Sequence, residues 1–264
     1  MIKLVVWLLL IAGVCYGCLC LYLFLRQRSL LYFPHPPPAS ADAEVLWLEN
    51  ADQRIKIWRV GDDSGPALIY FGGNAEDVSG NIPFFKTFDP SCTYYLMNYR
   101  GYGGSSGVPT EQSLFADSLA LYDLVSNHHD EIIVMGRSLG TGIAVYLASK
   151  RAATAVVLVT PYESMTALAS SYYPFMPVSP LLKDRYDSDT YAAGIAIPVL
   201  TLTAAYDEII PRRISDNLIA SFRPGIAEDI VIDKTGHNDI EQSPQYRLHL
   251  KRFLDEHIGT EKNQ

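Results

Sequence analysis

The sequence predicts an α/β fold in which helices flank a mostly parallel sheet of about eight strands, preceded by one transmembrane helix. From about residue 44 onwards, short apolar runs alternate with helix-length segments, the pattern of strand–helix–strand units with right-handed crossovers. Most of these runs are apolar throughout, as in strands that are covered on both faces. The N-terminus carries an uncharged stretch of membrane-spanning length.

The N-terminal stretch, residues 4–25, contains no charged side chain. At ~1.5 Å per residue, a helix of this stretch is roughly 33 Å long and can cross a hydrocarbon core of ~30 Å. The alternative is a cleaved signal peptide, whose apolar core is only about 7–15 residues long and ends at a small-x-small site. This run is longer and no Ala-x-Ala closes it. We therefore expect residues 1–28 to be an uncleaved anchor, which makes the protein a single-pass membrane protein.

A proline-rich segment around residues 34–40 follows the anchor. Such a segment favours polyproline II and acts as a stiff spacer. We therefore expect a linker at residues 29–43, an α/β domain at 44–258 and a C-terminal tail at 259–264. His35 is expected to be a linker residue without a chemical role.

The α/β domain is expected to open with a β-hairpin, because residues 44–49 and 54–60 alternate apolar and polar side chains around a polar connection. Helical periodicity marks residues 111–127 and 139–150. Further strands are expected at 67–71, 93–98, 131–136, 155–160, 198–204 and 229–233.

Composition argues against several classes of function. The formal net charge is −8 and no cluster of lysine and arginine stands out, so no nucleic-acid partner is expected. Cys15, Cys18 and Cys20 lie in the apolar N-terminal run and leave Cys92 alone in the domain, so the fold does not depend on a disulfide. No histidine or acid stands near the three N-terminal cysteines to complete a metal site, and no metal or cofactor is expected.

The motif G-x-S-x-G occupies residues 136–140, directly after an expected strand and before a helix rich in small residues. In that setting the serine lies on a strained turn, which exposes its hydroxyl above the sheet. Glycines at both ends let the neighbouring backbone approach without a Cβ clash. Ser138 is therefore the candidate nucleophile, and the backbone N–H of Leu139 is a candidate oxyanion-hole donor.

A serine nucleophile needs a base that is oriented by an acid, and chains with this motif carry them in the order Ser, acid, His. Asp207 follows the expected strand 198–204, and His237 follows 229–233. Both therefore lie at C-terminal strand ends, where open α/β sheets place their sites. Glu208 is the competing acid, and Asp207 is preferred. The other histidines are expected to be structural or solvated: His35, His128, His129, His249 and His257.

The second oxyanion donor is expected in the loop after strand 67–71. The pair Gly72-Gly73 allows close backbone approach there, and the amide of Asn74 or Ala75 is the candidate donor. An ordinary turn is the alternative interpretation.

The substrate-binding wall is expected to include Gly72 and Gly73, together with Tyr162 from the segment after strand 155–160. Phe175 and Met176, in an aromatic-rich stretch, are expected to belong to the same wall and indicate an apolar acyl group. Core packing is the alternative role for these side chains.

With these residues in place, the chain resembles the BEM46-like group of α/β hydrolases, which includes ABHD13- and ABHD17-type proteins, over residues 20–258. The resemblance implies the α/β-hydrolase fold and a serine hydrolase with Ser138, Asp207 and His237 as its catalytic triad. One departure is that Gly72 stands where the family usually has histidine, so the contacts of that histidine, which brace the loop, are expected to be missing. The segments that carry the resemblance are 32–34, 73–77, 98–107, 136–142, 207–211 and 236–239.

The sequence therefore predicts a membrane-anchored serine hydrolase that cleaves an ester or thioester through an acyl-enzyme. Its expected partners are a small acyl-ester or acyl-protein substrate and the membrane, which it meets through the N-terminal helix. A peptidase or amidase that uses the same triad is one alternative. A non-catalytic binding protein with the α/β-hydrolase fold is the other.

Overall fold

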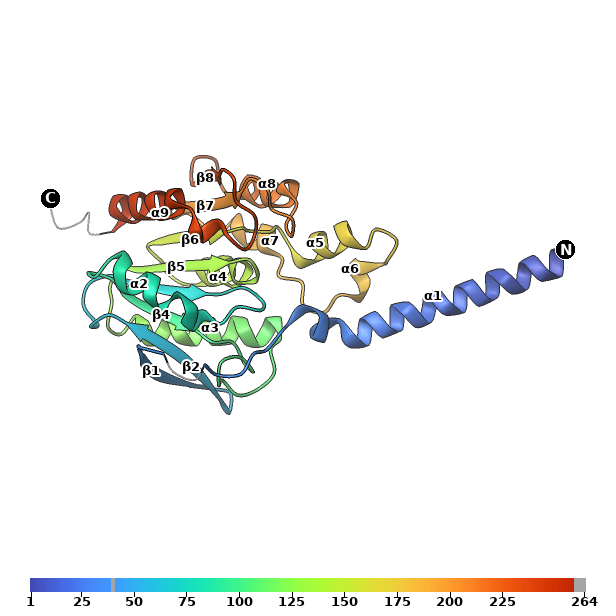
Figure 1. Ribbon diagram of the computed structural model, residues 1–264, viewed down its shortest axis with the longest axis horizontal. Helices are drawn as coiled ribbons and strands as arrows, with labels where there is room; N and C mark the ends of the chain where they lie inside the picture. Colours follow the sequence, from blue (N-terminus) through green and yellow to red (C-terminus); the bar gives the residue numbers. More distant parts are fainter. Residues whose placement is uncertain (39–40, 259–264) are drawn as a thin grey trace.

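The computed structural model describes residues 1–38 and 41–258, which form an eight-stranded sheet with helices on both faces and a long N-terminal helix (Figure 1). The strand order is β1-β2-β4-β3-β5-β6-β7-β8. The β1–β2 and β2–β4 pairs are antiparallel, and the remaining pairs are parallel. This arrangement confirms the predicted α/β fold with a mostly parallel sheet.

Most strands begin and end within two residues of their predicted positions. The differences are small shifts: β5 runs through Arg137, and β8 begins at Ala227. The strands are β1 Glu44–Asn50, β2 Gln53–Val60, β3 Ala67–Phe71, β4 Thr93–Met97, β5 Ile132–Arg137, β6 Ala155–Val159, β7 Val199–Ala204 and β8 Ala227–Ile232. The helices are α1 Ile2–Leu31, η1 Val78–Asn81, α2 Ile82–Phe88, α3 Glu111–Val125, α4 Leu139–Lys150, α5 Met165–Tyr172, α6 Val178–Leu181, α7 Ser188–Ala192, α8 Arg212–Ser221, η2 Ile240–Gln242 and α9 Pro244–His257.

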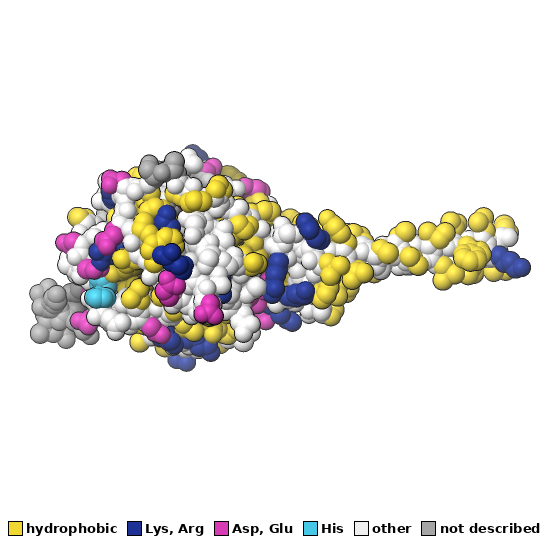
Figure 2. Space-filling view, turned by 90° about the horizontal axis from the view of Figure 1, so that it is seen from below, with side chains coloured by type: hydrophobic (Ala, Val, Ile, Leu, Met, Phe, Trp, Pro, Cys, Tyr) yellow, Lys and Arg dark blue, Asp and Glu magenta, His cyan; other side chains and the backbone are white. Residues whose placement is uncertain are grey.

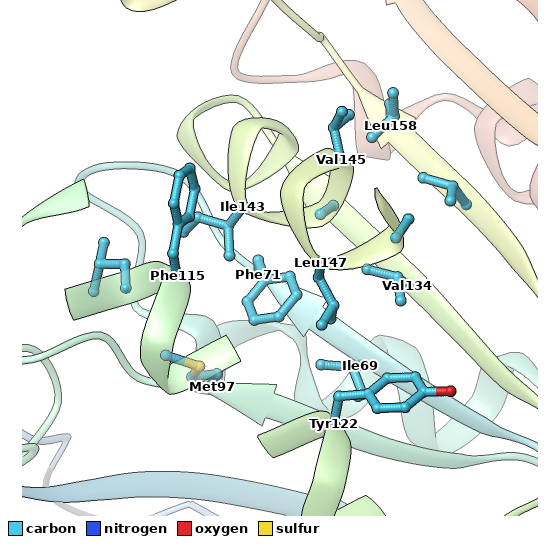
Figure 3. Close-up of a cluster of buried hydrophobic side chains, with 14 of the residues drawn as sticks. Ile69, Phe71, Met97, Phe115, Tyr122, Val134, Ile143, Val145, Leu147 and Leu158 are labelled. Carbon is cyan, nitrogen blue, oxygen red and sulfur yellow. The ribbon is translucent and has the colours of Figure 1, made fainter. Parts of the chain in front are cut away.

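Two buried apolar clusters, one on each face of the sheet, hold the layers together. One cluster joins the sheet to α3, α4, α7 and α8, and part of it is drawn in Figure 3. The other joins the opposite face to α2 and α9. All side chains of the central strands β3, β4 and β6 are buried, because helices cover both faces of the sheet. This packing gives the strand ends that carry the candidate site a rigid support.

Helix α1 projects from the body of the molecule (Figure 1) and has 30 residues, most of them apolar. By length and composition it is the one helix in the described ranges that is long and apolar enough to cross a membrane. It continues to Leu31, three residues beyond the expected end of the anchor.

The proline-rich segment, for which composition predicts a stiff spacer, lies along the domain. His35 Nε2 is 3.0 Å from the carbonyl oxygen of Glu76, and the His35 ring packs edge-on against Tyr102. The amide of Gly103 also donates to the His35 carbonyl, at 3.0 Å. His35 thus has a structural role that composition alone did not indicate. The expected tail, 259–264, lies outside the described residues.

Candidate active site

Ser138 lies on the turn between β5 and α4, with φ 48° and ψ −117°. This conformation is costly for a residue with a Cβ and persists only where the surroundings enforce it. The surroundings here are tightly packed backbone. A Cβ on Gly140 would lie 2.0 Å from the carbonyl oxygen of Phe71, and one on Gly136 would lie 2.3 Å from the carbonyl oxygen of Gly140. Both glycines are therefore required for the turn that presents the Ser138 hydroxyl.

His237 connects Ser138 to Asp207. Its Nε2 is 2.9 Å from Ser138 Oγ, and its Nδ1 is 2.9 and 3.0 Å from the two carboxylate oxygens of Asp207. The three residues follow β5, β7 and β8 at the carboxyl edge of the sheet, and only 5% of His237 is exposed. The structure thus brings together the three residues that the sequence singles out, in an arrangement that can pass a proton from the hydroxyl to the imidazole.

The backbone around Asp207 fixes which acid faces the imidazole. Asp207 Oδ1 accepts hydrogen bonds from the amides of Ile209 and Ile210, at 2.9 and 2.7 Å. The competing acid, Glu208, accepts from the backbone amide of His237 at 3.2 Å. Glu208 therefore supports the His237 loop, whereas Asp207 contacts the ring.

The loop after β3 lies beside Ser138. Gly73, Asn74 and Ala75 line a pocket of about 420 Å³ together with Ser138 and Leu139. The amide of Leu139 is the first in α4, so it has no acceptor within the helix. Two candidate oxyanion segments therefore border the same pocket as the hydroxyl.

Hydrogen bonds brace this loop even though glycine occupies position 72. The Tyr99 hydroxyl donates to the Gly72 carbonyl, and the Tyr102 hydroxyl donates to the Asn74 carbonyl, both at 2.6 Å. The Asn74 side chain donates to the carbonyl of Leu31, at the end of α1, at 3.2 Å. The expected loss of bracing at position 72 is thus offset by two tyrosines and by contact with α1.

Arg137 joins three parts of the site, and sequence reasoning did not single it out. Its guanidinium lies 3.0 Å from Glu76 and 2.6 Å from Glu241, and it donates to the carbonyl of His237 at 3.2 Å. Glu76 in turn accepts from the amide of Gly73 at 2.7 Å. The only sequence signal for this network is that Arg137 is the second residue of G-x-S-x-G.

The charges of this network offset the cost of its burial. Burial lowers the pKa of Arg137, but the facing carboxylates of Glu241 and Glu76 outweigh that effect and raise the pKa above its usual range. Burial also raises the pKa of Glu241, and the positive charge of Arg137 opposes that rise. Arg137 therefore stays charged and holds both carboxylates beside it.

The predicted substrate-binding residues divide between different places. Tyr162 and Gly73 line the pocket beside Ser138. Gly72 is buried next to Val78 and Glu76, and it is not among the lining residues. Phe175 is 65% exposed, and Met176 lines a second groove against α1. In the described ranges, no three metal-ligating side chains gather into a potential metal site.

The strand order and the nucleophile turn define an α/β-hydrolase-fold protein, and comparisons with known proteins specify the family. A family model described as "alpha/beta hydrolase fold" matches residues 66–194. The chain is 34% identical to an uncharacterized protein from Mycobacterium tuberculosis, over 84% of each chain. It is 30% identical to alpha/beta hydrolase domain-containing protein 17C from Mus musculus, over 81% of this chain and 68% of that protein. The chain belongs to the ABHD17-type family of α/β hydrolases.

Solved structures share the same fold. An esterase from Pyrococcus furiosus is 16% identical with a TM-score of 0.69, over 85% of this chain and 100% of that chain. Alpha/beta hydrolase domain-containing protein 10 from mouse is 17% identical with a TM-score of 0.63, over 81% and 98%. At these identities the likeness concerns the fold alone. Fold and family together support a hydrolase.

Proposed function

We propose that the chain is a membrane-anchored serine hydrolase that cleaves an ester or thioester through Ser138, His237 and Asp207. The observation that carries the proposal is the pair of contacts on His237. Its Nε2 is 2.9 Å from the Ser138 hydroxyl, and its Nδ1 is 2.9 Å from Asp207. This geometry makes the imidazole a base for the serine and holds it in the tautomer that the reaction needs.

In the first half-reaction Ser138 Oγ attacks the carbonyl carbon as its proton moves to His237 Nε2. The carbonyl oxygen becomes an oxyanion, for which the amide of Leu139 and that of Asn74 or Ala75 are the proposed donors. The tetrahedral intermediate collapses, His237 gives its proton to the leaving alcohol or thiol, and an acyl-Ser138 ester remains.

In the second half-reaction, water takes the place of the leaving group. His237 removes a proton from this water, which attacks the acyl carbon and forms a second oxyanion. Collapse releases the carboxylic acid, and the proton returns from His237 to Ser138. Asp207 stays ionised throughout and stabilises the positively charged imidazole.

Membrane anchoring is the second part of the proposal. The supporting observation is α1, an apolar helix that extends away from the body of the molecule and has no buried residue. The hydrogen bonds within a helix satisfy its backbone groups, so the helix can enter hydrocarbon. Insertion then removes its apolar surface from water.

A fluorophosphonate probe tests the nucleophile in the full chain. We expect covalent labelling of Ser138, identified by peptide mass spectrometry, and its loss in Ser138→Ala. Ser221→Ala, which changes a half-buried serine at the end of α8, far from the site in the sequence, is the control and should label normally. Unlabelled wild-type protein would contradict the proposal and favour a binding protein with this fold.

Turnover of matched substrates tests the bond that is cleaved. We expect hydrolysis of a thioester and an oxygen ester of the same acid, and slower hydrolysis of the corresponding amide. Preferred cleavage of the amide or of a peptide would instead identify a peptidase or amidase that uses the same residues.

A further inference from the structure

A second groove, of about 270 Å³, lies between the end of α1 and the segment 165–182, which contains α5 and α6 and is named the cap below. Helix α1 contributes Leu23, Phe24 and Leu30 to its lining. The cap contributes Leu168, Ala169 and Met176 among others. The anchor helix is thus one wall of this groove, and the cap is the other.

The groove adjoins the pocket at Ser138. Leu31, Met165 and Leu168 line both cavities. Leu31 is the last residue of α1, and Asn74 of the loop beside Ser138 donates to its carbonyl. The three side chains that border both cavities are apolar, as the path of a hydrocarbon tail to the Ser138 hydroxyl requires.

Hydrogen bonds and one ion pair hold α1 against the cap. The Tyr16 hydroxyl donates to the carbonyl of Phe175 at 2.8 Å. The Gln27 side chain donates to the carbonyl of Leu181 at 3.1 Å and accepts from the amide of Lys183 at 2.7 Å. Tyr16 and Gln27 lie about three turns apart on α1, so the helix is a fixed wall and not a loose tether.

The ion pair between Arg28, near the end of α1, and Asp184 has a buried acidic partner. Arg28 lies 2.8 Å from Asp184, whose side chain is only 4% exposed. Asp184 also accepts from the amide of Glu111 at 3.2 Å. Because the loss of Arg28 leaves a buried carboxylate without its counter-charge, this pair fixes where α1 leaves the domain.

Two polar side chains of the groove lining, Tyr172 and Gln27, have hydrogen-bond partners in the protein. The hydroxyl of Tyr172 donates to the carbonyl of Ile209 at 2.7 Å, and the Gln27 amide is occupied by the contacts given above. The remaining α1 lining between Leu23 and Leu31 is hydrocarbon and aromatic. A groove with this apolar lining suits a single hydrocarbon tail.

We propose that α1 is a specificity-determining wall of the acyl site as well as an anchor, and that the groove binds the hydrocarbon tail of a long-chain acyl ester. This inference rests on the proposed function, because it places the tail so that its carbonyl reaches Ser138. The tail enters from the bilayer along α1. Hydrophobic side chains gather where α1 joins the body (Figure 2), and Phe175 and Tyr173 of the cap are exposed.

Chain-length selectivity of the full chain, reconstituted in phosphatidylcholine nanodiscs, tests this proposal. The measured quantity is the ratio of kcat/KM for a 12-carbon ester to that for a 4-carbon ester of the same alcohol. Each buried methylene favours the longer ester by up to about fourfold, so the wild-type ratio should be well above 1. A ratio near 1 would overturn the proposal.

Two tryptophan variants on α1 form a matched pair. Leu23 lines the groove, whereas Leu25 is 67% exposed and lies outside it. We expect the ratio to fall at least tenfold in Leu23→Trp and to stay within about twofold of wild type in Leu25→Trp. Ala169→Phe fills the groove from the cap and should lower the ratio as Leu23→Trp does. Equal chain-length ratios in all three variants and the wild type would show that α1 and the cap do not contact the acyl tail.

A photoreactive hexadecanoic acid separates this inference from the proposed function. In Ser138→Ala it should crosslink to peptides of the cap, and the added Leu23→Trp change should reduce that labelling. Cap labelling in a chain that hydrolyses no ester would uphold the groove and reject the hydrolase. Ester hydrolysis without cap labelling would reject the groove and uphold the hydrolase.

Discussion

Arg137 is the residue whose contacts reach furthest through the site. It is the last residue of β5, next to Ser138, and its ion pairs and hydrogen bond connect the loop after β3, η2 and the backbone of His237. A planar guanidinium makes such contacts in several directions at once, which a lysine ammonium does not reproduce. In the proposed reaction, Arg137 is a positioning residue for Gly73 and His237.

We expect Arg137→Lys to lower kcat by about 10- to 100-fold with a smaller change in KM, because small misplacements of reacting groups cost about that much. Fluorophosphonate labelling of Ser138 should slow by a similar factor. Arg252→Lys, at an exposed ion pair with Glu228, is the control and should change neither quantity. A loss of stability alone, with an unchanged kcat in the folded fraction, would contradict the positioning role.

Cys92 offers a test of the buried core. It is 4% exposed, and burial raises the pKa of its thiol to about 12. The folded chain therefore holds this proton more tightly than the unfolded chain. The stabilisation is complete below pH 9, the ordinary value, and is lost as pH rises towards 12.

Only the thiolate reacts with iodoacetamide, so Cys92 in the folded chain should stay unmodified at pH 9. About one Cys92 thiol in a thousand is ionised at that pH, against half of an ordinary thiol. Peptide mass spectrometry after timed alkylation measures this directly. Rapid alkylation in the absence of urea would show that the strand end is open, whereas alkylation only in urea fits the structure.

Sequence reasoning located Ser138, Asp207 and His237 because chain order and strand ends determine where they meet. The same reasoning could not find the partners of Arg137. Glu76 and Glu241 are far apart along the chain, and no periodicity relates them. The contacts of His35 could not be predicted for the same reason, because its partners, Glu76 and Tyr102, come from other segments of the fold.

At the scale of elements, the contact between α4 and β3 shapes the site. Gly140, in the first turn of α4, faces the backbone of Phe71 and Gly72 at the end of β3. Backbone atoms cannot rotate away as a flexible side chain can, so this contact leaves no space for a methyl group. The close approach brings the loop after β3 next to Ser138.

We expect Gly140→Ala to destabilise the chain by about 3 kcal/mol or more, because overpacking against backbone forces the elements apart. For a domain of this size the melting temperature should fall by roughly 6–12 °C, and Ser138 labelling should be impaired in the protein that remains folded. Gly80→Ala is the matched control, because its new Cβ would meet nothing within 4 Å. Similar melting temperatures for the two variants would refute this packing argument.

The sequence predicted the helices and strands that have a long apolar or periodic pattern, but not the short helices. The central strands are continuous apolar runs, and α3 and α4 are long enough to show helical periodicity. Helices α2, α5, α6 and α7 have only four to eight residues each. Such short helices owe their stability to tertiary contacts, so no local pattern predicted the cap.

At the scale of the whole molecule, α1 and the domain form one structure. Apolar composition predicted an N-terminal helix but not where it ends. Helix α1 continues through Arg26 and Arg28 to Leu31, because Asp184 neutralises Arg28 and Asn74 accommodates the last carbonyl. The proline segment then packs on the domain. A boundary drawn from composition at residue 28 therefore divides a region that the fold holds together.

Charges placed along α1 test how this structure meets the membrane. Leu10 and Val14 lie near the middle of the span and are exposed in the structure. An arginine at the centre of a spanning helix costs about 2.5–3.5 kcal/mol, so Leu10→Arg with Val14→Arg should release the chain from membranes washed with alkaline carbonate. Ile2→Arg with Leu4→Arg adds the same charge at the helix start, where the side chains reach the surface, and should leave the chain in the membrane pellet. Equal retention of both double variants would show that α1 does not hold the protein in the bilayer.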